Sequence, residues 1–98
     1  MGKMDLSDFY CTCCGNKGIP IIRSGAKREL GHLKKLFCLT CQKEVNHVEI
    51  RPRTKYTLED FYLEYDNENF NEQGIRKMEY TQLRHRLNNE GKLYYKEV

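Results

Sequence analysis

Two Cys-x-x-Cys pairs, Cys11 with Cys14 and Cys38 with Cys41, are the residues in this sequence best suited to chemistry. Each pair places two sulfurs on one tight turn, so two pairs joined by a hairpin can surround a metal ion. Four thiolates satisfy zinc completely and leave no coordination position open for a substrate. The 23 residues between the pairs slightly exceed the usual ~15–20, which a longer hairpin accommodates. The pattern predicts one structural zinc ion bound by these four cysteines.

Cys13, the fifth cysteine, leaves other ligand sets open at the first pair. Cys11 with Cys14 keeps the two-residue spacing and puts Gly15 directly after the second ligand, where a positive φ lets backbone N–H groups turn towards sulfur. We therefore expect Cys13 to be a bystander at the tip of the turn. Two alternatives to a metal site remain: unrelated free thiols, and a dithiol redox pair.

Histidine is also a common metal ligand and catalytic base, so His32 and His47 are further candidates. Because four cysteines already complete a zinc site, we expect both histidines to pack on a strand or to be exposed. The dipeptide Asn46-His47 leaves open a metal-dependent nuclease. However, the sequence shows neither a second metal cluster nor the paired carboxylates that phosphodiester cleavage would use, and we expect no enzymatic activity.

The composition explains why a metal would help this chain to fold. Of its 98 residues, 39% are hydrophobic, 32% are charged and none is tryptophan, so burial alone builds only a thin core. A structural zinc ion would add on the order of 10 kcal/mol to folding. The length allows one domain, or one small domain with an appendage.

The sequence pattern favours a soluble protein of the cytoplasm. No N-terminal stretch combines a basic start, an apolar run and a small-residue cleavage site. No run approaches the about 18 apolar residues of a membrane span. An odd number of cysteines, five, fits a reducing compartment, in which close cysteine pairs bind metal more often than they form disulfides.

The first half of the chain has the order of elements found in a zinc ribbon. Residues 1–8 are predicted to be a polar lead. Three later segments are apolar or alternating, as strands are: Ile19–Ile22, the residues before Cys38, and residues 44–50. They predict a three-stranded antiparallel sheet with two zinc knuckles over residues 1–55, because Pro52 marks the end of the last strand.

The second half begins with a predicted amphipathic helix of about ten residues. Thr57 followed by Asp60 is a variant of the capping box that starts helices. The predicted apolar face consists of Leu58, Phe61, Tyr62 and Tyr65, and the opposite face of Glu59, Asp60 and Glu64.

Three more segments complete the predicted fold. Residues 67–76 are rich in asparagine, which favours turns, and are predicted to be a loop anchored by Phe70. A second helix is expected over residues 78–90, ending at Gly91, with Tyr80, Leu83 and Leu87 on the face that packs on the ribbon, and a closing strand is expected over residues 92–98. The predicted fold class is α+β, with residues 56–98 as an acidic, tyrosine-rich helical appendage packed on the ribbon.

The charge is divided unevenly between the two halves. Residues 1–56 carry eleven Lys or Arg against five Asp or Glu, whereas residues 57–98 carry six against nine. A basic surface can bind phosphates weakly, with salt dependence and without sequence preference. A solvated charged face is the alternative, and no aromatic residue is expected among these cations to stack on bases. The candidate nucleic-acid-binding residues are Arg23, Lys27, Arg28, Lys34, Lys35, Arg51 and Arg53.

The acidic half carries most of the seven tyrosines, more than a small core can bury. Tyrosine is favoured at protein interfaces, so an acidic, tyrosine-bearing surface suits a protein partner. The candidate protein-binding residues are Tyr62, Tyr65, Glu59 and Glu64.

Residues 11–50, with the segments 31–38 and 46–50, resemble the small four-cysteine zinc-ribbon proteins of Gram-positive bacteria and their phages. The resemblance implies the four-cysteine site named above. For function it implies a binder of host or viral machinery.

We therefore expect a non-enzymatic zinc-ribbon binding protein, an accessory factor of transcription or another nucleic-acid process. Its expected partners are a host or viral protein of that machinery and, weakly, nucleic acid. The alternative is a phage-encoded inhibitor that binds a host or defence protein in the host cytoplasm. A metal-dependent nuclease is a minor alternative.

Overall fold

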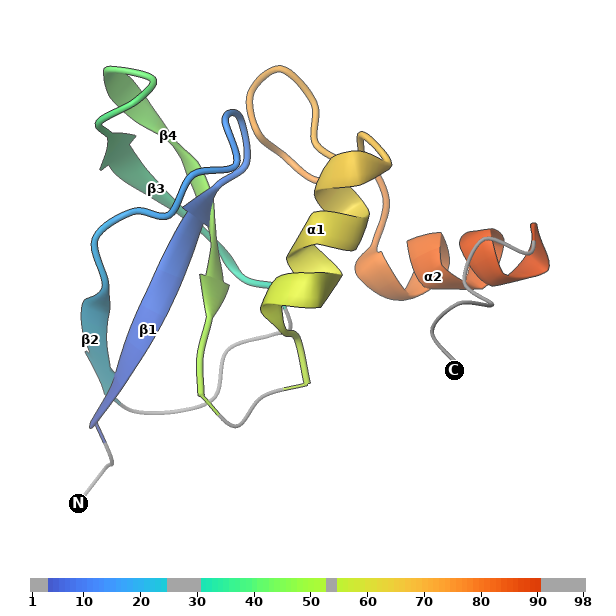
Figure 1. The fold of residues 1–98 in the computed structure, drawn as a ribbon, viewed down its shortest axis with the longest axis horizontal. Coiled ribbons are helices and arrows are strands. Elements are labelled where there is room, and N and C mark those ends of the chain that lie inside the picture. Colours follow the sequence, from blue (N-terminus) through green and yellow to red (C-terminus); the bar gives the residue numbers. More distant parts are fainter. Residues whose placement is uncertain (1–3, 25–30, 53–54, 91–98) are drawn as a thin grey trace.

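A computed structural model describes residues 4–24, 31–52 and 55–90 of the chain (Figure 1). The fold is α+β, as predicted, with four strands and two helices in these residues. The elements are β1 (Met4–Cys11), β2 (Ile21–Ser24), β3 (Leu33–Cys38), β4 (Lys43–Ile50), α1 (Leu58–Asp66) and α2 (Tyr80–Asn89). The predicted closing strand over 92–98 lies outside the described residues.

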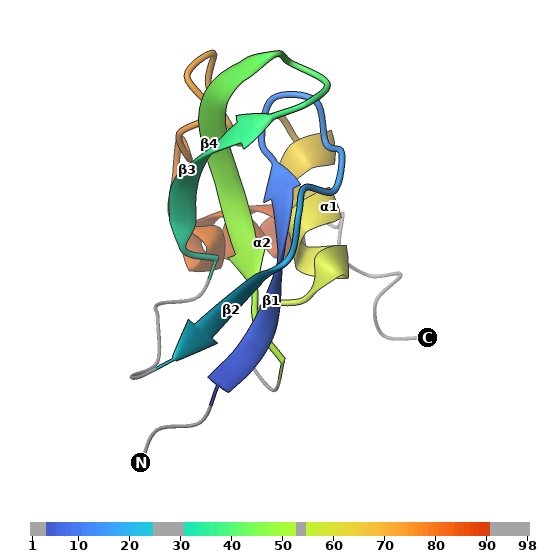
Figure 2. The ribbon, with the colours of Figure 1, turned by 90° about the vertical axis from the view of Figure 1, so that its left-hand side faces the viewer.

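The strands form one curled antiparallel sheet in the order β2-β1-β4-β3. Strand β1 pairs with β2 through its first half, where Leu6 faces Ile22. It pairs with β4 through its second half, where Cys11 faces His47. Figure 2 shows β1 passing from its pairing with β2 to its place beside β4. The switch of partners lies between Ser7 and Asp8, in the middle of β1.

The prediction of a three-stranded sheet preceded by a polar lead is wrong, because most of that lead forms β1. Its polar residues misled the prediction, although a strand turns alternate residues to opposite faces. Ser7 and Phe9 are fully buried on one face, while Leu6 on the other face is exposed. Strand β2 also begins two residues later than expected, after Pro20, which has no N–H for a ladder.

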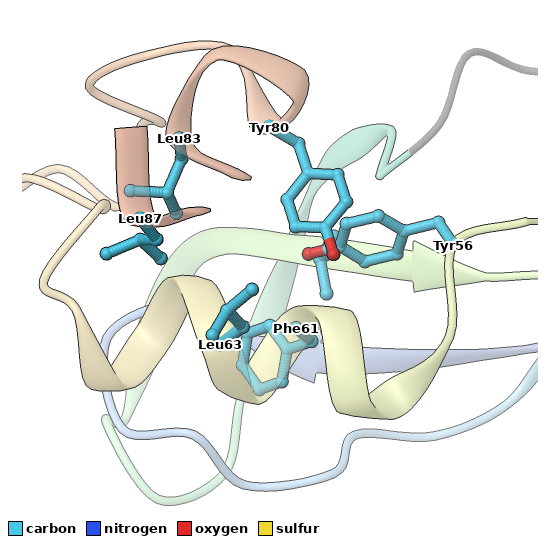
Figure 3. Close-up of a cluster of buried hydrophobic side chains, with 7 residues drawn as sticks. Tyr56, Phe61, Leu63, Tyr80, Leu83 and Leu87 are labelled. Carbon is cyan, nitrogen blue, oxygen red and sulfur yellow. The ribbon is translucent and has the colours of Figure 1, made fainter. Parts of the chain in front are cut away.

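The helices cover one face of the sheet. Their buried side chains meet Val48 of β4 in one cluster, six of whose residues are labelled in Figure 3. These six are Tyr56, Phe61, Leu63, Tyr80, Leu83 and Leu87. The predicted buried face of α2, with Tyr80, Leu83 and Leu87, is confirmed. None of the helices in the described part of the chain is long and apolar enough to span a membrane.

The start of α1 confirms the predicted capping box. The Asp60 carboxylate accepts a hydrogen bond from the backbone N–H of Thr57 at 2.8 Å, so it satisfies a donor that the helix leaves without a partner. After α1, residues 67–76 form a loop as predicted, and Phe70 packs against the core cluster. The loop carries the chain back to the first cysteine turn, where the Thr12 hydroxyl donates to the Gly74 carbonyl at 2.9 Å.

Candidate metal centre

The four cysteines predicted to bind metal lie together at one end of the sheet. Cys11 ends β1 and Cys38 ends β3, while Cys14 and Cys41 lie in the turns that follow. All four sulfurs lie within 4.8 Å of one another. The closest distances join Cys14 to Cys38, at 3.6 Å, and Cys11 to Cys41, at 3.8 Å. A donor set of four close sulfurs fits one metal ion with soft, tetrahedral coordination.

The two cysteine turns have the same construction. The N–H groups of Cys13 and Cys14 donate to the Cys11 sulfur, each at 3.3 Å, and that of Cys41 donates to the Cys38 sulfur at 3.4 Å. Four residues after the first cysteine of each pair, a positive φ closes the turn: Gly15 at 79° and Gln42 at 61°. Glycine at the first turn was the signal for this geometry. Gln42 carried no such signal, because its side chain disfavours a positive φ.

The pKa values of the thiols depend on burial and on these N–H groups. Burial raises the pKa of the Cys11 thiol, although two N–H donors oppose the rise. Burial also acts to raise the pKa of Cys38, but hydrogen bonds from the Cys41 N–H and the Cys14 side chain outweigh it and lower the pKa to about 7. Cys38 therefore offers a thiolate near neutral pH, whereas Cys11 would lose its proton when a metal ion binds.

Cys13 and the two histidines lie outside this group of four. The Cys13 sulfur is directed to the Glu72 carbonyl, 4.0 Å away. His47 is buried, with Nδ1 2.9 Å from the Val45 carbonyl oxygen, and burial lowers its pKa. His32 is half-buried beside β3. The Asn46 amide, part of the nuclease hypothesis, donates to the Gln73 carbonyl at 2.9 Å.

Two arginines of the predicted nucleic-acid surface are instead held in ion pairs. Arg23 lies 3.3 Å from the Glu49 carboxylate, and Arg51 lies 3.5 Å from that of Asp5. Their side chains are only 11% and 9% exposed. The expectation that both contribute to an open basic surface is wrong, because strand pairing brings each of them to a carboxylate distant in the sequence.

The remaining predicted cations divide into two groups. Lys34 is half-buried and Lys35 is exposed, both on β3. Lys27, Arg28 and Arg53 lie outside the described residues. The described part of the predicted basic surface is therefore concentrated on one edge strand of the sheet.

The predicted protein-binding residues also differ in exposure. Tyr62 is 45% exposed, Glu59 is exposed, and Tyr65 is half-buried with its hydroxyl donating to the Cys13 carbonyl at 3.3 Å. Glu64 is 0% exposed, so placing it on a solvent-facing side of the helix is wrong. The loop and α2 pack over that side of α1 as well.

Glu64 forms a buried ion pair that the sequence pattern did not indicate. Two nitrogens of the Arg76 guanidinium donate to its carboxylate, at 2.6 and 2.8 Å, and the Tyr56 hydroxyl donates to it as well. Arg76 also donates to the Gly31 carbonyl at 2.9 Å, so it connects the loop, α1 and the chain before β3. Burial acts to lower the pKa of Arg76, but Glu64 outweighs it and the pKa is raised.

A groove lies between the first cysteine turn and the loop after α1. Its volume is about 640 Å³. The lining residues include two aromatic rings, a thiol, three carboxylates and one lysine, namely Tyr65, Phe70, Cys13, Asp66, Glu68, Glu72 and Lys77. The ion pairs of the described residues use other carboxylates, so these three have no such partner there.

Comparison of the chain with models of protein families, with curated proteins and with solved structures gives no match. The resemblance to small zinc ribbons of Gram-positive bacteria and their phages stays a prediction. The cysteine cluster and the surfaces around it are therefore the features that bear on the function of this chain.

Proposed function

We propose that this protein is a non-enzymatic binding protein whose cysteine end is held by one structural zinc ion. The observation that carries the proposal is the approach of four cysteine sulfurs to within 4.8 Å of one another. Four sulfurs favour zinc or an iron centre among the metals of proteins, and zinc accepts this set in a closed tetrahedron. A closed site has no position for a substrate, so the metal supports a surface instead of a reaction.

Metal analysis tests the zinc assignment. We expect one zinc per chain in protein purified under reducing conditions, and cobalt substitution should give the visible absorption of a tetrahedral thiolate site. Bound iron with a charge-transfer spectrum would replace zinc in this proposal. A metal content near zero in folded, reduced protein would remove the metal site altogether.

The proposed process is one that acts on nucleic acid, in the cytoplasm, with the protein as an accessory factor. It is supported by cations on and beside β3 that have no ion-pair partner among the described residues, Lys34, Lys35 and Lys43. Phosphate contacts are strongest at low salt. We expect gel shifts with DNA or RNA at low salt that weaken as salt rises. No shift with either nucleic acid would reject this part of the proposal.

The second candidate function is inhibition of a host or defence protein by direct binding. The groove favours it, because two aromatic rings and three carboxylates without ion-pair partners in the described chain suit a basic segment of a protein. A pull-down with the zinc-loaded protein tests this. We expect a captured protein to be lost from a Glu68→Gln/Glu72→Gln variant and retained by a Glu44→Gln/Glu59→Gln variant, whose altered residues lie outside the groove. Equal capture by both variants would exclude the groove.

A further inference from the structure

One aromatic side chain, Phe37, stands in solvent at the cysteine end of β3. It is 55% exposed. Lys35 and Leu33 lie on the same face of the strand, because alternate residues of a strand share a face. Leu33 packs against the core cluster under the helices, but the helices do not cover Phe37. The ring therefore lies beyond the covered part of the sheet, two residues from an exposed lysine.

The backbone of Phe37 is held by its pairing with β4 and by the cysteine turn that follows it. Its strand partner is Glu44 of β4, and the next residue, Cys38, pairs with Lys43. Cys38 belongs to the four-sulfur group, and its carbonyl accepts the Gln42 N–H at 2.7 Å. A metal ion on Cys38 would therefore hold the backbone that carries the ring. Binding to a segment whose backbone is already fixed loses less conformational entropy.

The charges around Phe37 are mainly positive. Lys35 is its neighbour on the same face, whereas Lys34 of this edge strand and Lys43, which pairs with Cys38 at the start of β4, lie on the other face. The ion pairs in the described part of the chain use other cations. Glu44 is the one carboxylate directly opposite the ring. Lys35 beside the ring, together with two cations without counter-ions on the other face of the same sheet edge, favours a polyanion over an apolar protein surface.

We propose that Phe37 is a stacking platform for an unpaired base of single-stranded nucleic acid, with Lys35 contacting the adjacent phosphate and with Lys34 and Lys43 adding to the positive potential at this edge of the sheet. This inference rests on the proposed nucleic-acid function and narrows it to a ligand class. An exposed ring stacks on any unpaired base, whereas the bases of a duplex already stack on one another. The sequence pattern did not indicate this site, because no aromatic residue was expected among the cations, although Phe37 follows Lys35 by two residues.

Because the chain contains no tryptophan, a single introduced indole reports on its own surroundings. We would prepare Phe37→Trp and, as a matched control on α1, Tyr62→Trp, since Tyr62 is also exposed, at 45%. Zinc-loaded proteins would be titrated at low salt with oligo-dT and oligo-U of about fifteen nucleotides. We expect quenching in Phe37→Trp and none in Tyr62→Trp. Equal quenching in both variants would overturn the proposal.

Affinities of the wild-type ring and its replacements give the second test. Phe37→Leu keeps an apolar side chain but removes the ring, so the affinity for both oligonucleotides should fall at least about five-fold. Phe37→Trp should bind as tightly as the native protein. Lys35→Gln should reduce the slope of log affinity against log salt by about 0.7. Unchanged binding by Phe37→Leu would exclude stacking on this ring.

A duplex of the same length separates this inference from the function on which it rests. We expect the duplex to bind more weakly than either single strand. Binding of all three nucleic acids with equal affinity, or independently of Phe37, would overturn the stacking site and leave the proposed nucleic-acid function standing. Binding of none of them at low salt would overturn both and point to a protein partner. Preference for oligo-dT or oligo-U would identify the ligand as DNA or RNA.

Discussion

The two ends of strand β4 lie in environments that are stabilised by different means. Near its start, Val45 belongs to a small cluster whose other buried members are Cys11 and Cys38. Near its end, Val48 belongs to a cluster of seven buried residues with side chains from both helices. A cluster of one valine and a few thiols buries too little apolar surface to be stable without a metal ion. The cluster under the helices has no such need.

Metal removal should have the largest effect and should separate the two ends most clearly. Chelation, or Cys38→Ser, removes a metal ion worth on the order of 10 kcal/mol, comparable with the whole stability of a small domain. We expect the metal-free protein to lose the amide signals of the cysteine turns, whereas the helical circular-dichroism signal still shows an unfolding transition, at a lower denaturant concentration. An unchanged transition after complete chelation would show that the cysteine end needs no metal.

The helix-covered end should depend instead on its buried ion pair. Arg76→Met leaves the Glu64 carboxylate buried without its charged partner, and we expect a loss of about 3–5 kcal/mol in the free energy of unfolding. Arg86→Met is the control, because Arg86 pairs with Glu90 on the surface and such pairs contribute about 1 kcal/mol or less. Denaturant unfolding of zinc-loaded proteins measures both. Similar losses in the two variants would argue against a special role for the buried pair.

Gly74 lies in the loop after α1, at the point where this loop contacts the first cysteine turn. Its φ is +77°, and a Cβ there would overlap the Thr12 hydroxyl. Gly74→Ala should cost roughly 1–3 kcal/mol and loosen the loop from the first cysteine turn while zinc stays bound. Gly18→Ala, with no positive φ and only ordinary contacts, should cost less. Amide hydrogen exchange at Thr12 measures the loosening of the loop, and metal analysis measures whether zinc stays bound. Loss of zinc from Gly74→Ala would show that the cysteine end and the helix-covered end are not separable.

Alkaline pH should weaken the helix-covered end. Burial, and then the charge of Glu64, raise the pKa of Tyr56 above its ordinary value of 10.0. The unfolded chain then releases this proton at a lower pH than the folded protein does. Stability is therefore complete below pH about 10 and falls above it, by about 1.4 kcal/mol per pH unit for one proton. Tyr56→Phe should flatten the fall; an unaltered slope in that variant would exclude Tyr56 as its source.

The smallest effect is expected at Cys13, the cysteine outside the group of four. Cys13→Ser should leave the zinc content near one per chain and change the free energy of unfolding by no more than about 0.5 kcal/mol. Metal analysis and denaturant unfolding check both values. Loss of metal from this variant would make Cys13 a ligand and would revise the composition of the cysteine end.

The features that depend on short-range spacing could be predicted from the sequence. Three features are of this kind: the two cysteine pairs, the capping box at Thr57 and the buried face of α2. In each of them the residues lie within a few positions of one another, so local backbone geometry decides them. Strand β1 was missed because the polarity of its residues hid their alternation, and only pairing with β2 and β4 shows which face is buried.

The tertiary structure alone decided which charges remain on the surface. Arg23, Arg51 and Glu64 look alike in the sequence as solvated charges, yet each has a partner at least twelve residues away that only the fold brings within hydrogen-bonding or ion-pair distance. Conversely, Phe37 looks like a core residue and is exposed, because the helices end short of it. Burial depends on what packs on every side of a residue, and that depends on contacts between distant parts of the chain.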